Sequence, residues 1–272
     1  MEILLFQADI PPGLDRAARE ARVRQLCERL GAELEGLKRR PTLAVLPELC
    51  TVEYSDEAFN NLHELAEEVH GASFQEFSTI AKRYGVAISF SLPIAEKGRT
   101  YISNLVIGSD GELLSRYDKV HLAQLGASHE KRYFSPGDRL GVFTLDDCRF
   151  GVLLCYDFRF PAFVQAMCTS GELDVLLHPV AFTRDETFAS WQHFIITRAL
   201  ENQVYVLSLN RAGTDWGNSI VCPPWVDSEH QAERLGLGEE CRLVTIDRQL
   251  ITAVRERIPL RADRLADYRN LD

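Results

Sequence analysis

Three side chains of different chemistry each stand where a predicted buried strand ends. Glu48 follows a short apolar run, Lys119 closes a strand-like segment, and Cys155 follows Val152-Leu-Leu154. A carboxylate can serve as a general base, an ammonium group can stabilise developing negative charge, and a thiolate is a nucleophile. The three together are suited to acyl transfer. Their spacing along the chain does not bring them together, so only the fold can do so.

Cys155 lies in the turn between a predicted strand and a helix that begins near Pro161. Backbone N–H groups and the positive end of a helix dipole favour the thiolate at such a turn. An ordinary cysteine has a pKa of about 8.5 and is mostly protonated at neutral pH. We therefore expect this turn, with help from Lys119, to lower the pKa of the Cys155 thiol.

Each of these residues also has an ordinary structural explanation. Glu48 could be a solvated carboxylate at a strand end, and Lys119 could be an edge-strand lysine that prevents aggregation. A buried cysteine usually behaves as a small hydrophobic residue. We give that interpretation to the six other cysteines, which are Cys27, Cys50, Cys148, Cys168, Cys222 and Cys241.

The elements that must position these residues alternate between strands and helices. Strands are predicted at 3–8, 43–46, 86–92, 100–107, 112–119, 140–145, 149–154, 175–178 and 204–209. Helices are predicted at 15–38, at 59–84 with a break near Gly71, from Pro161 onward and at 190–202. Strands with consecutive apolar residues are covered on both faces, as in layered α/β folds. With no repeat or linker in the sequence, we expect an α/β sandwich in a single domain, 1–272.

The composition argues against several classes of protein. The 272 residues carry 30 Lys and Arg against 40 Asp and Glu, a net charge of −10, and without a basic patch we expect no nucleic-acid partner. No apolar run approaches the ~20 residues that span a bilayer, so no membrane partner is expected. The seven cysteines show no zinc-ligand spacing, which predicts no metal site. With no export signal evident, we expect reduced thiols and a cytoplasmic location.

Three motifs, in this order, resemble those of the nitrilase superfamily of carbon–nitrogen hydrolases. They are Leu46-Pro-Glu48, Tyr117-Asp-Lys119-Val-His-Leu122 and Leu154-Cys155-Tyr-Asp-Phe-Arg-Phe-Pro161. Further similar segments are Glu130-Lys-Arg-Tyr-Phe-Ser-Pro-Gly137, Trp191 with Arg198-Ala-Leu-Glu-Asn-Gln-Val-Tyr-Val206, Asn210-Arg-Ala-Gly213, Gly217-Asn-Ser219, Arg257-Ile-Pro259 and Asp263-Arg-Leu-Ala-Asp-Tyr268. Because the matches cover nearly the whole chain, the resemblance implies the family's four-layer αββα sandwich and its Glu-Lys-Cys triad.

The resemblance implies that Cys155 attacks the carbonyl carbon of a small amide while Glu48 takes the thiol proton. Lys119 and the backbone N–H of Tyr156 would hold the oxyanion, and Glu130 would be a fourth catalytic member near Lys119. A thioester intermediate would then be hydrolysed, after release of ammonia or an amine. The family's chemistry requires no metal and no organic cofactor.

The nucleophile motif is similar to that of the branch containing omega-amidase and deaminated-glutathione amidase, which act on amides of carboxylate-bearing metabolites. Arg159 is a candidate cation for such a carboxylate, although it could equally form a structural salt bridge. Tyr54 and Phe182 are candidate pocket residues. We expect the pocket walls to come from Tyr54 and from the loops at 122–129, 182–188 and 216–226.

Several alternatives stay open. The chain could be an N-carbamoyl amidohydrolase, a nitrilase or a non-catalytic binding member of the fold. Nitrilases, however, usually carry Trp at the position of Tyr156. Family members usually form at least homodimers, which we also expect here. Two features depart from the family. Pro223-Pro-Trp-Val226 replaces a hairpin that contains Pro and Gly. His178 lies at a strand end, where it either faces the pocket or is a hydrogen-bonded structural histidine.

Overall fold

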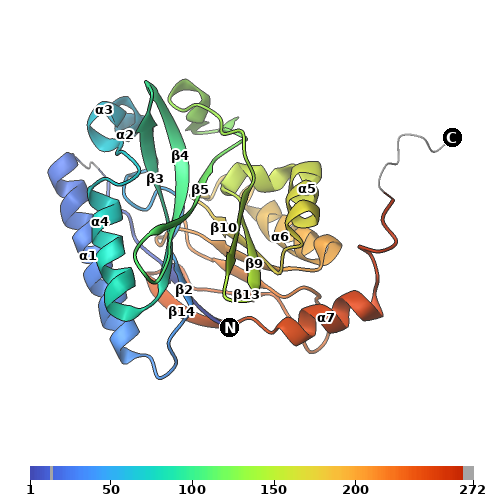
Figure 1. Cartoon of the computed structure of the whole chain (residues 1–272). Coiled ribbons are helices and arrows are strands. Elements are labelled where there is room, and N and C mark those ends of the chain that lie inside the picture. The colour runs from blue at the N-terminus through green and yellow to red at the C-terminus, as the bar shows by residue number, and fades with distance from the viewer. Residues whose placement is uncertain (13–14, 266–272) are drawn as a thin grey trace.

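Two six-stranded mixed β-sheets form the centre of the computed structural model, which describes residues 1–12 and 15–265 (Figure 1). The first sheet has the order β14 (Glu240–Thr245), β1 (Glu2–Gln7), β2 (Leu43–Val45), β3 (Ala87–Glu96), β4 (Arg99–Ile107), β5 (Leu113–Asp118). The second has the order β13 (Glu233–Arg234), β12 (Ile220–Cys222), β11 (Tyr205–Leu209), β10 (Val175–Pro179), β9 (Cys148–Val152), β8 (Gly141–Leu145).

Helices cover the outer face of each sheet (Figure 1). Helices α1 (Arg16–Gly36) and α4 (Ala72–Tyr84) pack on the first sheet, and α5 (Pro161–Gly171) and α6 (Phe188–Asn202) pack on the second. The remaining elements are α2 (Asp56–Asn60), α3 (Leu62–Leu65), α7 (Arg248–Arg257), the 3₁₀ helices η1 (Glu130–Arg132) and η2 (Cys155–Arg159), and the small hairpin β6 (Gln124–Leu125) and β7 (Ser128–His129). The expected αββα layering is confirmed.

The inner strands of the first sheet are buried on both faces, as the consecutive apolar residues of β1 and β2 predict. Ile3 and Leu5 of β1 face the core between the sheets, whereas Leu4 and Phe6 face the core under α1 and α4. Side chains that alternate between two apolar layers leave no face of the strand for water. The inner strands are therefore fixed between layers, which gives the residues at their ends a rigid support.

Strand β3 runs four residues beyond the predicted end at residue 92. Pro93 lies inside it, where its missing N–H would normally break a ladder. Strand β2 pairs with β3 only as far as Ser89. Two positions after Pro93, on the same side of the strand, the N–H of Ala95 donates to the carbonyl of Glu67 outside the sheet. The proline therefore lies where β2 has already ended, a position that tolerates it.

Strand β14 and helix α7 are not predicted from the sequence. Strand β14 is a half-buried edge strand, antiparallel to β1, and its residues show no clean alternation of burial. Helix α7 follows it, with its Asp247 cap accepting the N–H of Gln249. The similar segment 263–268 lies partly outside the described residues, which end at residue 265. Of the helices within the described ranges, none has the length and apolar character needed to cross a bilayer.

The strand directions bring distant segments to one end of the sandwich. In the first sheet β1, β2 and β3 are parallel, and β5 runs in the same direction because β4, which lies between β3 and β5, is antiparallel to both. In the second sheet β9, β10 and β11 are parallel. The residues that follow β2, β5, β9 and β10 therefore gather where the carboxyl ends of these strands meet.

Candidate active site

Lys119 lies at the centre of a buried cluster of charges. It directly follows β5 and has no exposed surface. Its Nζ donates to Glu48 Oε1 at 2.8 Å and to Glu130 Oε1 at 2.7 Å. Burial by itself would lower the pKa of Lys119, but the charges of Glu130 and Glu48 outweigh it and raise that pKa well above its ordinary value. Lys119 is therefore a cation, and two carboxylates engage two of its three N–H donors.

Glu48 lies in the turn after β2, and both of its carboxylate oxygens have partners. Oε1 accepts from Lys119, and Oε2 accepts the backbone N–H of Ala181 at 2.9 Å. Burial raises the pKa of Glu48; the charge of Lys119 opposes this shift and that of Glu130 adds to it, so the pKa is raised overall. A carboxyl group whose pKa moves toward neutrality is a better general base than an ordinary one.

Arg211 fixes the main chain of the Glu48 turn. This residue follows β11 and is almost fully buried. Its guanidinium donates to the carbonyl oxygen of Glu48 at 3.1 and 3.2 Å, to that of Leu49 at 2.8 Å and to that of Val52 at 2.9 Å. Burial lowers the pKa of Arg211 to about 10, an effect that Glu48 opposes. The guanidinium is therefore charged at neutral pH and satisfies three buried carbonyl groups.

Glu130 begins η1 and is fully buried. Its Oε1 accepts from both Lys119 and the hydroxyl of Tyr54, at 2.7 and 2.6 Å. Its Oε2 accepts the backbone N–H of Ala123 at 2.7 Å. Three donors thus hold this carboxylate, which in turn fixes the ammonium group of Lys119.

Cys155 begins η2 with a φ of +43°, in the left-handed region that residues with a Cβ seldom adopt. Its side chain is half-buried and interacts electrostatically with Glu48, Lys119 and Glu130. The structure therefore brings together the three residues that the sequence separates by tens of positions. The predicted fourth residue, Glu130, joins them.

The pKa of the Cys155 thiol departs from the sequence-based expectation. Burial raises it well above its ordinary value, and Glu48 raises it further, whereas Lys119 and the N–H of Ala181 act in the opposite direction. The turn leads into a short 3₁₀ helix before α5 begins, and two carboxylates surround one ammonium group. The thiol is therefore protonated at rest and needs a base at the moment of attack.

A cavity of about 40 Å³, here called the Cys155 cavity, opens beside this cluster. Its lining contains all the candidate substrate residues together with the nucleophile and its neighbour; the full set is Tyr54, Ala123, Leu125, Ser128, Cys155, Tyr156, Arg159, Ala181, Phe182, Thr183, Asp185 and Thr187. Three of the expected walls, at Tyr54, 122–129 and 182–188, therefore contribute. The fourth does not: no residue of 216–226 lines this cavity.

Arg159 points its guanidinium into this region without a carboxylate partner among the described residues. It donates to the hydroxyl of Thr187 at 2.9 Å, and Thr187 donates in turn to Asp185 at 2.7 Å. The guanidinium also lies over the rings of Phe182 and Phe194, at 5.6 and 5.3 Å. Within the described residues the expected structural salt bridge of Arg159 is not found, and the contacts of its guanidinium are this hydroxyl and these two rings.

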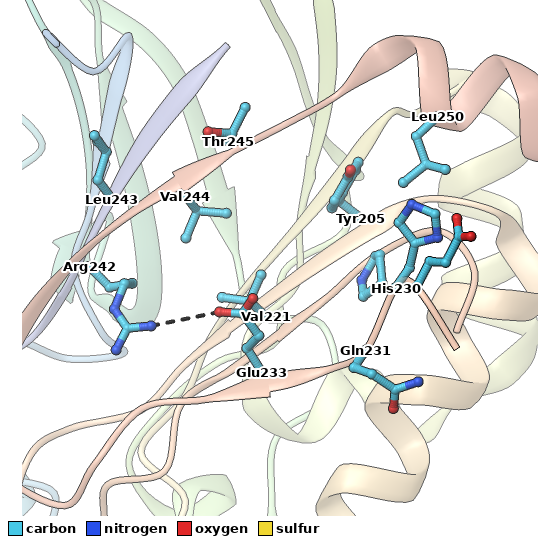
Figure 2. A pocket seen from close by; sticks show the side chains of 12 residues that line it. Tyr205, Val221, His230, Gln231, Glu233, Arg242, Leu243, Val244, Thr245 and Leu250 are labelled. Carbon is cyan, nitrogen blue, oxygen red and sulfur yellow. Dashed lines mark ion pairs between the residues drawn. The ribbon is translucent and has the colours of Figure 1, made fainter. Parts of the chain in front are cut away.

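The loop at 216–226 has a different place. Pro223 lines a separate hollow of about 350 Å³ formed by β12, β13, β14 and α7, here called the β14 hollow. Figure 2 shows Tyr205, His230 and Leu250 on one side of it and the ion pair between Arg242 and Glu233 on the other. These residues lie toward the amino ends of β1 and β11, since Thr245 pairs with the first residue of β1. The hollow is therefore remote from the carboxyl ends at which Glu48 and Cys155 lie.

Two positioning residues escape the sequence-based prediction. Arg211 is one, and Asp157 is the other: its carboxylate accepts the hydroxyl of Tyr117 at 2.6 Å, the N–H of His121 at 2.8 Å and the N–H of Leu154 at 3.1 Å. Asp157 therefore ties the lysine segment to the nucleophile turn. A signal exists for both, since each is a charged residue within a few positions of the end of a buried apolar strand.

The described residues contain no group of three or more His, Cys, Asp and Glu side chains arranged to hold a metal ion. The site consists instead of two carboxylates, an ammonium group and a thiol. That set of groups can move a proton and stabilise an oxyanion.

Comparison with known proteins gives the same family from sequence and from structure. A carbon–nitrogen hydrolase family model matches residues 6–256. Omega-amidase NIT2-A of Xenopus laevis is 32% identical over 250 residues, 88% of each chain, and omega-amidase NIT2 of Homo sapiens is 32% identical over 234 residues, 82% of each chain.

Solved structures agree over almost the full length. Nit3 of Saccharomyces cerevisiae, a member of branch 10 of the nitrilase superfamily, superposes with a TM-score of 0.81 at 26% identity and covers 99% of this chain and 96% of its own. A mutant amidase from Nesterenkonia sp. AN1, whose active-site cysteine carries the acetamide moiety of fluoroacetamide, has a TM-score of 0.74 at 25% identity, with coverages of 96% and 97%. The chain thus belongs to the carbon–nitrogen hydrolase family of the nitrilase superfamily.

Proposed function

We propose that this protein is an amidase that hydrolyses the C–N bond of a small, non-peptide amide through a thioester on Cys155. The observation that carries the proposal is the fully buried ammonium group of Lys119, held between Glu48 and Glu130 beside a small cavity that the thiol of Cys155 lines. Such an arrangement places a base, an oxyanion donor and a nucleophile at one point. Covalent acetamide on the cysteine of the Nesterenkonia amidase supports the same role for Cys155.

In the first step, Cys155 Sγ bonds to the carbonyl carbon as Glu48 accepts the thiol proton. The raised pKa of Glu48 helps this transfer, because the proton moves to a stronger base. The carbonyl oxygen becomes an oxyanion, which the free N–H of the Lys119 ammonium group and the backbone N–H of Tyr156 stabilise. A preorganised donor of this kind contributes ~3–4 kcal/mol to acyl transfer.

In the second step, the C–N bond breaks and Glu48 returns the proton to the leaving nitrogen, which departs as ammonia or an amine. A water molecule then gives a proton to Glu48 and attacks the thioester carbon. The Sγ–C bond breaks, the thiol is restored, and the acid product leaves. Glu130 keeps the Lys119 ammonium group oriented throughout. No step requires a metal or an organic cofactor.

The Cys155→Ala variant tests this proposal. It should release no ammonia from an amide panel and should take up no label from iodoacetamide at this position, because the attacking atom is gone. Cys241→Ala is the matched control: it removes a half-buried thiol far along the chain and should leave turnover unchanged. Ammonia release by Cys155→Ala at the wild-type rate would refute the assignment.

A carboxylate on the substrate would find a partner in Arg159. The guanidinium lines the Cys155 cavity without an ion-pair partner among the described residues, which supports a ligand of negative charge. The names of the omega-amidase relatives agree with amides of this class. Arg159→Met should raise KM for a carboxylate-bearing amide about tenfold and leave KM for a neutral amide of equal size unchanged, since one charged contact is worth ~1–2 kcal/mol. Equal effects on both amides would contradict this role.

The products of the panel distinguish the alternatives. Ammonia with a carboxylic acid identifies an amidase. Carbon dioxide released together with ammonia would identify an N-carbamoyl amidohydrolase, and turnover of a nitrile would identify a nitrilase. Turnover of none of the three, in a folded protein with an alkylatable Cys155, would favour a non-catalytic binding member of the fold.

A single domain over 1–272 is supported by the family match over residues 6–256. The homodimer stays a prediction. Phe160, Phe163 and Val164 have the apolar character that suits a helix interface, but Phe160 and Phe163 pack against His121 within the chain, and Val164 is in the core. A monomer by light scattering at micromolar concentration would refute it. The cytoplasmic location also stays a prediction, with which the seven free cysteines agree.

A further inference from the structure

His178 contacts the turn that carries the nucleophile. It lies on β10, is 1% exposed and does not line the Cys155 cavity. Its Nε2 lies 2.9 Å from the carbonyl oxygen of Cys155, and its Nδ1 lies 2.8 Å from Ser208 Oγ. The ring stacks on Phe158 of η2, with ring centroids 4.2 Å apart. Thus the residue contacts the main chain of the nucleophile and is not itself part of the cavity wall.

The partners of the His178 ring fix its tautomer. A carbonyl oxygen can only accept, so Nε2 carries the hydrogen and donates to Cys155. In the neutral ring Nδ1 then accepts from the hydroxyl of Ser208, and Ser208 Oγ accepts the indole N–H of Trp191 at 3.1 Å. Burial lowers the pKa of His178 to about 4, which agrees with a neutral ring. A directed chain of three hydrogen bonds therefore runs from α6 through β11 and β10 and ends on the Cys155 carbonyl.

The peptide bond after Cys155 links this chain to the reaction. The carbonyl of Cys155 and the N–H of Tyr156 belong to one planar trans unit, so they point in opposite directions. Holding the carbonyl toward β10 therefore turns the Tyr156 N–H away from β10. As the second residue of a 3₁₀ helix, Tyr156 has no acceptor for this N–H within the helix.

We propose that His178 is a positioning residue that sets the orientation of the Cys155–Tyr156 peptide group, and with it the backbone donor for the oxyanion. The proposal rests on the function given above for Tyr156. Cys155 has a left-handed backbone that a residue with a Cβ does not keep without support. Asp157 holds the residue before it, by accepting from the N–H of Leu154. His178 holds the carbonyl on the other side of the nucleophile.

Two substitutions of His178 separate this role from simple packing. His178→Phe keeps a flat ring on Phe158 and removes the donor, whereas His178→Gln carries an N–H at about the position of Nε2. The first should lower kcat about 10- to 100-fold, less than the 10²–10³ for complete loss of an oxyanion donor, with KM nearly unchanged. The second should restore most of kcat. A purely structural role would lower the melting temperature without this rescue.

Alkylation of Cys155 by iodoacetamide gives the second readout. That reaction forms no oxyanion, so His178→Phe should slow it much less than it slows amide turnover. The proposal would be overturned if His178→Phe kept the wild-type kcat. It would also be overturned if this variant lost alkylation and turnover by the same fraction and His178→Gln did not restore kcat. If His178→Phe does not fold, His178→Asn replaces it, because the shorter Asn amide does not reach the Cys155 carbonyl. Equal kcat values in His178→Asn and His178→Gln would then contradict the proposal.

Failure of the proposed function gives a different pattern. In that case Cys155→Ala itself keeps its turnover, whatever the His178 variants do. Loss of turnover in Cys155→Ala with no kcat difference among the His178 variants would refute the positioning role alone.

Discussion

The Cys155 cavity measures about 40 Å³, whereas the β14 hollow measures about 350 Å³. An ion pair lines the hollow, and a cluster of ion pairs lies beside the cavity. In the hollow, Arg242 is 41% exposed and pairs with Glu233, which is 69% exposed, at 3.7 Å. At the cavity, Lys119 and its two carboxylate partners have no exposed surface, and their N–O distances are 2.7 and 2.8 Å. The larger space thus has the weaker and more hydrated charges.

The difference shows what distinguishes a reactive site from a surface hollow. Exposed ion pairs are screened by water and contribute ~0–1 kcal/mol. Charges removed from water interact strongly, shift one another's pKa values and exist only where hydrogen bonds compensate their desolvation. At the cavity those compensating bonds come from Ala181, Ala123 and Tyr54. Buried charges whose carboxylates are hydrogen-bonded, and not the volume of the space, therefore distinguish the site.

The largest expected effect contrasts one carboxylate from each region. Glu48→Gln should lower kcat/KM by 10²–10⁴, the range for loss of a general base, because an amide cannot take the thiol proton. Glu233→Gln in the β14 hollow should leave kcat/KM unchanged. Ammonia release by both purified variants, with circular dichroism to check folding, makes the comparison. Similar losses in the two variants would remove the distinction between the regions.

A pair of arginine variants extends the contrast to stability. Arg211→Met leaves the buried carbonyl groups of Glu48 and Val52 without this donor, whereas that of Leu49 keeps the N–H of Val52. Each such group costs about 1–3 kcal/mol, so the free energy of unfolding should fall by about 2 kcal/mol or more. Arg242→Met loses surface pairs with Glu233 and Glu240, in which the arginine is 41% exposed, and should change that free energy by less than about 1 kcal/mol. Urea denaturation of both proteins measures the difference. An unchanged stability in Arg211→Met would show that the Glu48 turn needs no support.

The smallest expected effect is a shift of the pH profile. The active form has Glu48 ionised, so activity falls as the pH drops through the pKa of Glu48. The charge of Glu130 raises that pKa. In Glu130→Gln the pKa of Glu48 should therefore be lower, and the acid limb of kcat/KM should move to lower pH. Glu229→Gln in the β14 hollow should leave the limb in place, and a shift to higher pH in Glu130→Gln would contradict the assigned sign.

Much of the fold was accessible from the sequence because the inner strands have an unambiguous pattern. The apolar runs before Glu48 and Cys155 predict doubly covered strands, and Asp146-Asp147 predicts the turn between β8 and β9. Strand β14 was not accessible, because an edge strand that is half-buried lacks both alternation and an apolar run. The end of β3 was misjudged because the tolerance for Pro93 depends on where a neighbouring strand stops.

By itself the sequence determined which reactive side chains end buried strands, and thus the candidates Glu48, Lys119 and Cys155. Residue type and strand position are local properties, so they can be read along the chain. The tertiary structure alone decided that the thiol pKa is raised instead of lowered, that Arg211 supports the base, and that His178 bonds to the nucleophile's carbonyl. Desolvation and hydrogen-bond direction depend on which segments surround a group, and those segments are more than 20 residues away from it.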